Sequence, residues 1–170
     1  MKLGFIGVGN MGNPMAANLV KAGHSLQVFD IRRESAANLL EAGATWANSP
    51  KDAATGAEAT FMSLPMPADV ERVTLADDGV LAGTQSGGAI FDMSTNSPTV
   101  VRNLCEKAKA KGVAFLDAPV SGGVRGARAG SLAIMVGGDK AVYDKYEPAL
   151  KAMGANVIHC GEIGAGKTTV

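Results

Sequence analysis

Three glycines near the start of the chain, Gly7, Gly9 and Gly12, are spaced as GxGxxG. They follow the apolar run Lys2–Ile6, which is typical of a strand, and they open the segment Met11–Ala22, which has helical spacing. In this context the first glycine permits a tight turn, the second lets the backbone approach a pyrophosphate, and the third lets the helix pack against the strand. Free N–H groups at the start of the helix then face the anion. The spacing therefore predicts a loop that holds the phosphates of a dinucleotide. The other residues assigned to this loop are Val8, Asn10 and Met11.

An acidic residue, Asp30, ends the next apolar run, Ser25–Asp30. A carboxylate at this place accepts hydrogen bonds from the ribose hydroxyls of NAD. Arg32 and Arg33 follow directly, and a guanidinium there can instead bind the 2′-phosphate of NADP or be only a solvated surface charge. We expect a nicotinamide cofactor, with NAD favoured and NADP as the alternative.

A second glycine motif lies near the end of the sequence, where Gly161–Thr168 reads GEIGAGKT and fits the phosphate-binding pattern GxxxxGKT. It follows the strand-like run Asn156–Cys160. A working P-loop also needs a helix after its lysine and a separate acidic strand that holds Mg²⁺. We expect a glycine turn here and keep a P-loop nucleotide site as an alternative.

Short apolar runs alternate with segments of helical spacing along the whole chain, which indicates βα units wound into one sheet. The runs are apolar nearly throughout, as expected for strands that helices cover on both faces. We therefore predict an α/β fold with a doubly wound, mostly parallel, Rossmann-like sheet. The predicted strands are Lys2–Ile6, Ser25–Asp30, Ala59–Leu64, Gly88–Met93, Val113–Leu116, Leu132–Val136 and Asn156–Cys160. The predicted helices are Met11–Ala22, Ser35–Ala42, Ala68–Leu75, Pro98–Lys111 and Lys140–Met153. Left-handed helix caps are predicted at Gly23, Gly43, Gly112 and Gly154.

The composition argues against several other classes of function. The 16 basic and 16 acidic residues balance, so no net charge attracts nucleic acid or an anionic membrane. No apolar stretch is long enough to span a membrane or to form a signal-peptide core. The two cysteines lie outside any CxxC pair, which favours the reducing cytoplasm. The two histidines and two cysteines have no close ligand spacing, and we expect no metal site.

Four segments together resemble the β-hydroxyacid dehydrogenase family. They read GFIGVGNMGNPMAANL from Gly4, MSLPMPADV from Met62, DMSTNSP from Asp92 and DAPVSGGVRGARAGSLAIMVGGD from Asp117. Within this family the chain is most similar to the branch of 3-hydroxyisobutyrate dehydrogenase and tartronate semialdehyde reductase, and the similarity extends from end to end. The resemblance implies reversible oxidation of a short β-hydroxy acid, such as 3-hydroxyisobutyrate or glycerate, to its semialdehyde, with hydride passing to the nicotinamide.

The resemblance also assigns residues to the two ligands. Thr95 would lie beside the nicotinamide ribose. Further along the cofactor the family pattern places Leu64, Pro65 and Met66. The substrate carboxylate would be held by Ser121, Gly122 and Gly123. A hydroxyl followed by two glycines offers several donors to a small anion, although a plain turn has the same composition.

One position departs from the family's pattern. Members bring a lysine to the reacting oxygen, where it stabilises the developing alkoxide and exchanges a proton with it. Gly164 and Gly166 match the turn that precedes this lysine, but Val170 stands at the expected position. Lys167 lies three residues earlier and would roughly share that face of a helix. The catalytic acid/base is therefore unassigned.

The family pattern also implies a larger protein. We expect residues 1–163 to form the dinucleotide-binding domain and residues 164–170 to begin a linker to an all-helical domain that this sequence lacks. That domain would close the pocket for the small substrate and form the interface of a homo-oligomer. The 170-residue chain alone would then bind cofactor and turn over little or no substrate. A non-catalytic cofactor-binding module is the alternative.

Overall fold

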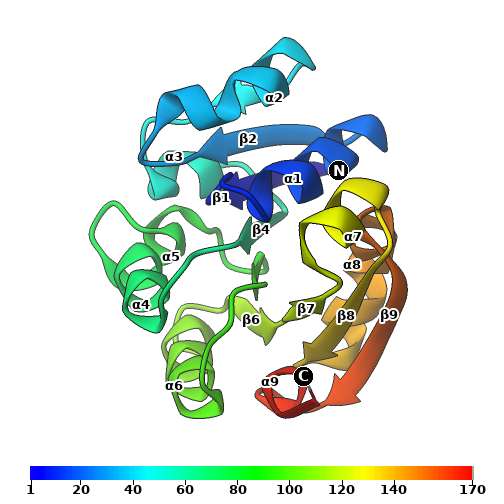
Figure 1. Ribbon diagram of the computed structural model, residues 1–170. Helices are drawn as coiled ribbons and strands as arrows, with labels where there is room; N and C mark the ends of the chain where they lie inside the picture. Colours follow the sequence, from blue (N-terminus) through cyan, green and yellow to red (C-terminus); the bar gives the residue numbers. More distant parts are fainter. Residues whose placement is uncertain (170) are drawn as a thin grey trace.

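The first apolar run of the chain forms strand β1 (Lys2–Ile6), which lies inside the sheet with parallel neighbours on both sides (Figure 1). The computed structural model describes residues 1–169. Within them the strand order is β3-β2-β1-β4-β5-β6-β8-β7, and β9 pairs with β8. The strands from β3 to β6 in this order run parallel, whereas β8 is antiparallel to β6 and β7. The remaining strands are β2 (Ser25–Phe29), β3 (Thr45–Trp46), β4 (Ala59–Met62), β5 (Ala89–Asp92), β6 (Ala114–Asp117), β7 (Val120–Ser121), β8 (Leu132–Gly137) and β9 (Gly154–Gly161).

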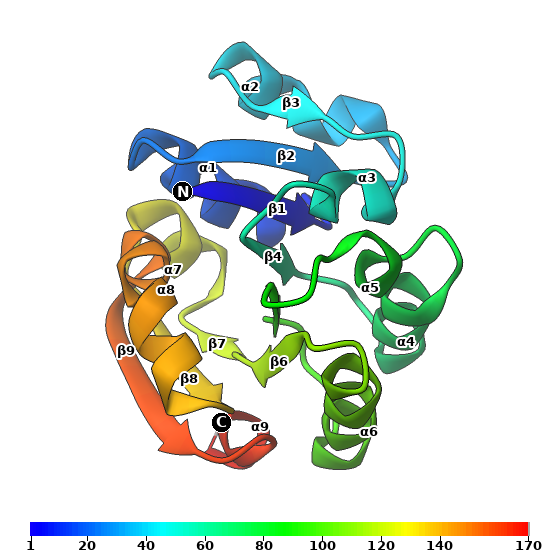
Figure 2. The same cartoon turned by 180° about the vertical axis from the view of Figure 1, so that it is seen from behind.

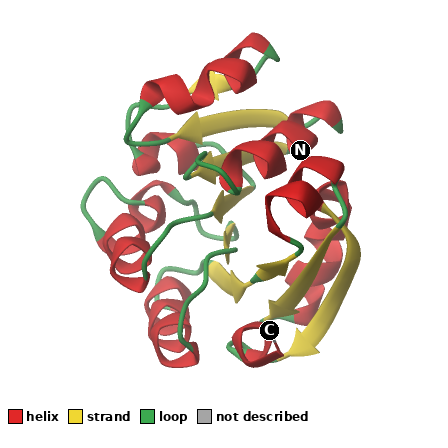
Figure 3. Cartoon of the chain, viewed as in Figure 1, coloured by secondary structure: helices red, strands yellow, loops and turns green. Residues whose placement is uncertain are grey.

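Helices cover both faces of this sheet, as Figures 2 and 3 show from opposite sides. Alternate residues of the buried strands point to opposite faces, so Phe5 of β1 belongs to one core and Ile6 to the other. The first core also takes side chains from α1, α2, α7 and α8, and the second from α3, α4, α5 and α6. The helical segments are α1 (Gly12–Lys21), the 3₁₀ turn η1 (Arg33–Ala36), α2 (Ala37–Glu41), α3 (Pro50–Ala54), α4 (Pro67–Leu75), α5 (Val80–Gly83), α6 (Pro98–Lys109), α7 (Gly123–Ala129), α8 (Lys140–Met153) and α9 (Ala165–Thr169).

Local sequence explains where several helices begin. Ser49, Ser97 and Asp139 precede α3, α6 and α8, and each side chain accepts a hydrogen bond from an N–H of the first turn. Proline stands at the first positions of α3, α4 and α6, where its missing N–H costs no helical bond. Helix α1 differs, because Met11 at its N-cap provides no side-chain hydrogen bond.

A row of aromatic rings crosses the centre of the first core. Phe61 of β4 stacks between Phe5 and Phe91, with ring centroids 6.2 and 5.0 Å apart. Tyr146 of α8 meets Phe91 edge-on at 5.8 Å, and its hydroxyl donates to the carbonyl of Glu58 over 2.9 Å. Because these residues come from three adjacent strands and a late helix, the row ties distant parts of the sequence together.

The predicted doubly wound, mostly parallel fold is confirmed, and each of the seven predicted strands overlaps an observed one. The two-residue strands β3 and β7 and the short helices α3, α5, α7 and α9 were not predicted. The cap predicted at Gly154 is wrong, because this residue has extended backbone angles (φ −140°, ψ 146°) and begins β9 directly after α8. Gly23, Gly43 and Gly112 do have positive φ.

No helix among residues 1–169 is long and apolar enough to cross a membrane.

We predict that Phe61→Ala lowers the free energy of unfolding by about 3–5 kcal/mol, because it removes a fully buried ring from the middle of the aromatic row. Urea unfolding without cofactor measures this. Ile31→Ala is the control, since Ile31 is 89% exposed and its loss should change stability by less than about 0.5 kcal/mol. Equal effects of the two substitutions would contradict the described core.

Candidate cofactor site

A cleft of about 670 Å³ opens where the parallel strands β1, β2, β4 and β5 end. Ligands of open α/β sheets bind at this edge, outside the carboxyl ends of the strands. The sequence-predicted residues that line the cleft are Gly7, Gly9, Asn10, Met11, Gly12, Asp30, Arg32, Leu64, Pro65, Thr95 and Gly123. Four predicted residues do not line it, namely Val8, Met66, Ser121 and Gly122. The structure thus brings most of the predicted residues to one cavity.

The three glycines of the loop are required for different reasons. Gly7 has φ +88°, and a Cβ there would overlap the carbonyl oxygen of Ser63. A Cβ on Gly12 would overlap the carbonyl oxygen of Gly7, because α1 begins directly against the end of β1. Gly9 is different, since its φ is not positive and a Cβ built there meets no atom within 4 Å. The protein's own packing therefore explains Gly7 and Gly12, whereas the exposed Gly9 leaves room for a ligand.

The start of α1 suits an anion. The side chain of Met11 does not cap the helix, and the first turn carries no acidic residue. The N–H groups at a helix start have no partners within the helix, and the helix dipole favours negative charge there. A dinucleotide's pyrophosphate is the group that fits an open glycine beside such a helix end. The residues present therefore fit NAD.

Asp30 joins this loop to the turn after β2. Its Oδ2 accepts the N–H of Val8 and its Oδ1 accepts the N–H of Arg32, each over 2.9 Å. Each carboxylate oxygen retains a further lone pair for a ribose hydroxyl. The side chain of Val8 is buried in the core, so Val8 takes part in the site through its backbone.

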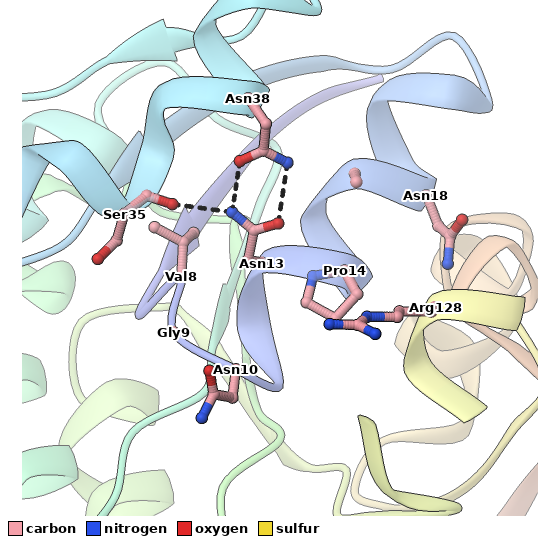
Figure 4. A pocket seen from close by; sticks show the side chains of 10 residues that line it. Val8, Gly9, Asn10, Asn13, Pro14, Asn18, Ser35, Asn38 and Arg128 are labelled. Atoms are coloured by element: carbon pink, nitrogen blue, oxygen red, sulfur yellow. Dashed lines mark hydrogen bonds between the residues drawn. The ribbon is translucent and has the colours of Figure 1, made fainter. Parts of the chain in front are cut away.

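A second cavity, of about 490 Å³, lies on the outer side of α1 (Figure 4). At its wall the amides of Asn13 and Asn38 exchange hydrogen bonds of 2.7 and 3.0 Å. Asn13 also donates to the carbonyl of Ser35 over 2.8 Å. Arg128 of α7 borders the opposite side, beside Pro14. The asparagine pair fixes α2 and η1 against α1, and with them the turn that carries Asp30.

Two loops form the other wall of the cleft. The N–H of Leu64, after β4, donates to the hydroxyl of Ser94, after β5, over 2.8 Å. Ser94 and its neighbours Met93 and Thr95 line the cleft. Met66 does not line the cleft and is 59% exposed. The Leu64 and Ser94 loops therefore hold each other at the end of the cleft opposite Asp30.

The segment predicted to bind the substrate carboxylate bends sharply between β7 and α7. Gly122 and Gly123 have φ of 132° and 63°, values that favour glycine. Ser121, Gly122 and Gly123 are exposed, and Val120 and Gly123 line the same cleft as the glycine loop. A small anion bound at this turn would therefore lie next to the cofactor cleft.

The glycine motif at Gly161–Thr168 is occupied by the protein's own groups. Asp117 at the end of β6 is fully buried, and it accepts the N–H of Gly164 at Oδ1 and that of Lys167 at Oδ2, both over 2.8 Å. These amides are thus not free to bind a phosphate. The geometry contradicts the P-loop alternative, and the motif is instead the turn into α9.

Lys167 extends into the interior, and its side chain is 1% exposed. Its Nζ lies 3.4 Å from Oδ2 of the fully buried Asp92 and donates to the carbonyls of Asp92 and Ser94. Burial lowers the pKa of Lys167, and the nearby carboxylates of Asp92 and Asp117 oppose this shift. Lys167 does not line the cleft, so it does not replace the missing lysine there. Val170, where the family pattern places that lysine, lies outside the described residues.

Sequence reasoning missed several residues of the cleft. Ser94 and Met93 adjoin the predicted Thr95, and the motif DMSTNSP contained them. Asp69 lies within the motif MSLPMPADV. Other residues come from the segment after β2 and from the end of α4, where no local pattern marks them: Ile31, Ser35, Arg72 and Val73. Asp69 and Arg72 form an ion pair of 2.8 Å on α4. Among residues 1–169, no three of the side chains His, Cys, Asp and Glu cluster as metal ligands would.

We predict that Gly9→Ala weakens NAD binding at least about tenfold, because its methyl group would enter the space of the pyrophosphate. The same substitution should change the free energy of unfolding by less than about 1 kcal/mol, since no protein atom lies near. Gly12→Ala is the comparison, and overlap with Gly7 should destabilise the fold by about 1–3 kcal/mol. Calorimetric titration and urea unfolding measure both effects. Unchanged NAD affinity in Gly9→Ala would show that the ligand does not approach this glycine.

Comparison with known proteins supports the assignment made from the geometry. Residues 2–161 match the family described as the NAD binding domain of 6-phosphogluconate dehydrogenase. The chain is 46% identical to 3-hydroxyisobutyrate dehydrogenase of Pseudomonas aeruginosa over 165 residues, which are 97% of this chain and 55% of that protein. It is also 46% identical to NAD-dependent L-serine dehydrogenase of the same organism over 166 residues, with 98% and 56% covered.

A solved structure of Mycobacterium tuberculosis 3-hydroxyisobutyrate dehydrogenase with L-serine superposes with a TM-score of 0.93 at 39% identity. The match covers 99% of this chain and 57% of that one. The chain therefore spans about half the length of the relatives it matches. The family match, the sheet order and the glycine loop agree, and the chain belongs to the family of NAD-binding domains described for 6-phosphogluconate dehydrogenase.

Proposed function

We propose that the protein to which this domain belongs oxidises a short β-hydroxy acid to its semialdehyde with NAD, and catalyses the reverse reduction. The observation that carries the proposal is the continuity of the cleft from the glycine loop to Val120 and Gly123, beside the exposed Ser121. Cofactor and a small carboxylate would lie next to each other there. The names of the two Pseudomonas relatives add support. 3-Hydroxyisobutyrate and L-serine each have a carboxylate and, on carbon 3, a hydroxyl.

The family resemblance and the positions of the residues support the following proposed roles. Bound NAD supplies the acceptor for the hydride. The glycine loop holds the pyrophosphate, Asp30 the adenosine ribose, and Thr95 adjoins the nicotinamide ribose. The hydroxyl of Ser121 and the bare backbone of Gly122 and Gly123 hold the substrate carboxylate and so orient the carbon that reacts. The group that exchanges the hydroxyl proton is not assigned to any residue.

We also propose domain boundaries, a cell compartment, an oligomeric state and a further substrate for the whole protein. Residues 1–163 form the cofactor domain and residues 164–170 begin the connection to a helical domain, although α9 already packs against β8 and β9. The whole protein is a cytoplasmic homo-oligomer, and its substrates include glycerate, the product of tartronate semialdehyde reduction. A cofactor-binding module without catalysis is the second candidate, which the valine at position 170 favours.

The proposed activity predicts a specific effect of Ser121→Ala on the full-length protein. The KM for 3-hydroxyisobutyrate or L-serine should rise at least about tenfold, because a donor to the carboxylate is lost. The affinity for NAD should not change, since the glycine loop is intact. Steady-state oxidation followed by NADH absorbance measures the KM, and Ser131→Ala on the exposed turn after α7 is the matched control. No oxidation of any short β-hydroxy acid by the unchanged protein would favour the non-catalytic module.

Cofactor preference gives a second prediction. The Asp30 carboxylate would repel the 2′-phosphate of NADP, so the chain should bind NAD more tightly than NADP. Asp30→Asn removes the charge and keeps one acceptor for the loop amides, and it should shift the ratio of the two affinities toward NADP at least about tenfold. The exposed Arg32 then remains to bind the phosphate. Titrations with both cofactors measure the ratio, with Asp77→Asn on an exposed turn as the control. Tighter NADP binding by the unchanged chain would contradict the preference.

A further inference from the structure

The loop that lines the nicotinamide end of the cleft is held from behind by a buried charge. Asp92 is the last residue of β5, and Ser94 and Asn96 follow it closely. The Asp92 carboxylate accepts the N–H of Ser94 over 3.0 Å and the side-chain amide of Asn96 over 3.2 Å. Lys167 of α9 adds an ion pair with the same carboxylate and hydrogen bonds to the carbonyls of Asp92 and Ser94. The ammonium group of Lys167 therefore contacts both the backbone carbonyls and the Asp92 carboxylate at the start of this loop.

The position of Lys167 is itself fixed. Asp117 accepts the backbone N–H of Lys167 and that of Gly164, which holds the start of α9 against the end of β6. Asp117 is the register partner of Asp92 on the adjacent strand, and both are fully buried. Two carboxylates buried side by side repel each other unless cations and N–H donors compensate them. Among residues 1–169 Lys167 is the ion-pair partner of Asp92, so its removal would leave the Asp92 charge with only the N–H donors of Ser94 and Asn96.

The effect of this arrangement reaches the cleft through Ser94. Lys167 and Asp92 do not line the cleft, whereas Met93, Ser94 and Thr95 do. The Ser94 hydroxyl accepts the N–H of Leu64, so the loop after β4 depends on the same anchor. The glycine loop and Asp30 lie at the other end of the cleft, and no hydrogen bond or ion pair of Lys167 involves them.

We propose that Lys167 is a positioning residue for the nicotinamide half of the cofactor, which it serves by fixing the Ser94 loop through Asp92. This inference rests on the proposed placement of the nicotinamide ribose beside Thr95. It assigns the lysine of GEIGAGKT neither to phosphate binding nor to proton transfer. The adenosine half of the cofactor binds independently of it.

The experiment compares NADH with ADP, which has the same adenosine diphosphate but lacks both the nicotinamide and the ribose that carries it. In Lys167→Met the affinity for NADH should fall about tenfold, while that for ADP stays within about twofold. The change in nicotinamide fluorescence on NADH binding should also decrease. Lys151→Met, on the exposed face of α8, is the control for loss of a lysine. Equal losses for both ligands, or no loss for NADH, would overturn the proposal.

A second variant separates positioning from general loss of folding. Lys167→Met leaves the buried Asp92 charge without its cation, so we also use Lys167→Met with Asp92→Asn, which removes both charges. This double variant should unfold at a higher temperature than the single one. Its affinity for NADH should still be lower than that of the unchanged protein, because the carbonyl of Ser94 has lost its donor. Normal NADH binding by the folded double variant would overturn the proposal. Failure of the hydroxy-acid assay would reject the proposed activity and leave these binding results unaffected.

Discussion

The close approach of Gly7 and Gly12 is the constraint on which the rest of the site depends. The start of α1 packs so closely against the loop after β1 that neither position has space for a Cβ, and the first turn of α1, which no side chain caps, lies beside the cleft. Asp30 then joins the loop to the turn after β2 through the N–H groups of Val8 and Arg32. The glycine loop, Asp30 and the turn after β2 are thus one hydrogen-bonded unit. A change in one of them displaces the others.

The opposite wall of the cleft is organised by buried charge. Asp92 and Asp117 end neighbouring strands in register, and their carboxylates accept N–H groups from the loops that follow and from α9. A buried carboxylate is tolerated only where its oxygens are satisfied, so each one selects a particular conformation of the surrounding loops. The cleft is therefore bounded on one side by bare backbone and on the other by loops that buried polar groups hold.

Much of this arrangement could be predicted from sequence, because it is encoded locally. GxGxxG between a strand and a helix, followed by an acid after the next strand, predicts the tight turn from β1 into α1 and the place of Asp30 beside it. Strands β3 and β7 could not be predicted, since two residues carry no periodicity. Gly154 was misassigned because a glycine after a helix usually takes positive φ, whereas here β9 starts at once beside Leu132. The inward course of Lys167 depends on Asp92, 75 residues away in the chain, and no local pattern contains it.

The central claim is that a nicotinamide dinucleotide binds at the first glycine loop. Amide resonances of the 170-residue chain, followed by NMR while NAD is added, test this claim residue by residue. We expect saturable shifts at Gly9, Asn10 and Met11, with the signals of Gly164 and Lys167 shifting far less. Unchanged signals at the first loop, or principal shifts at the second motif, would contradict it.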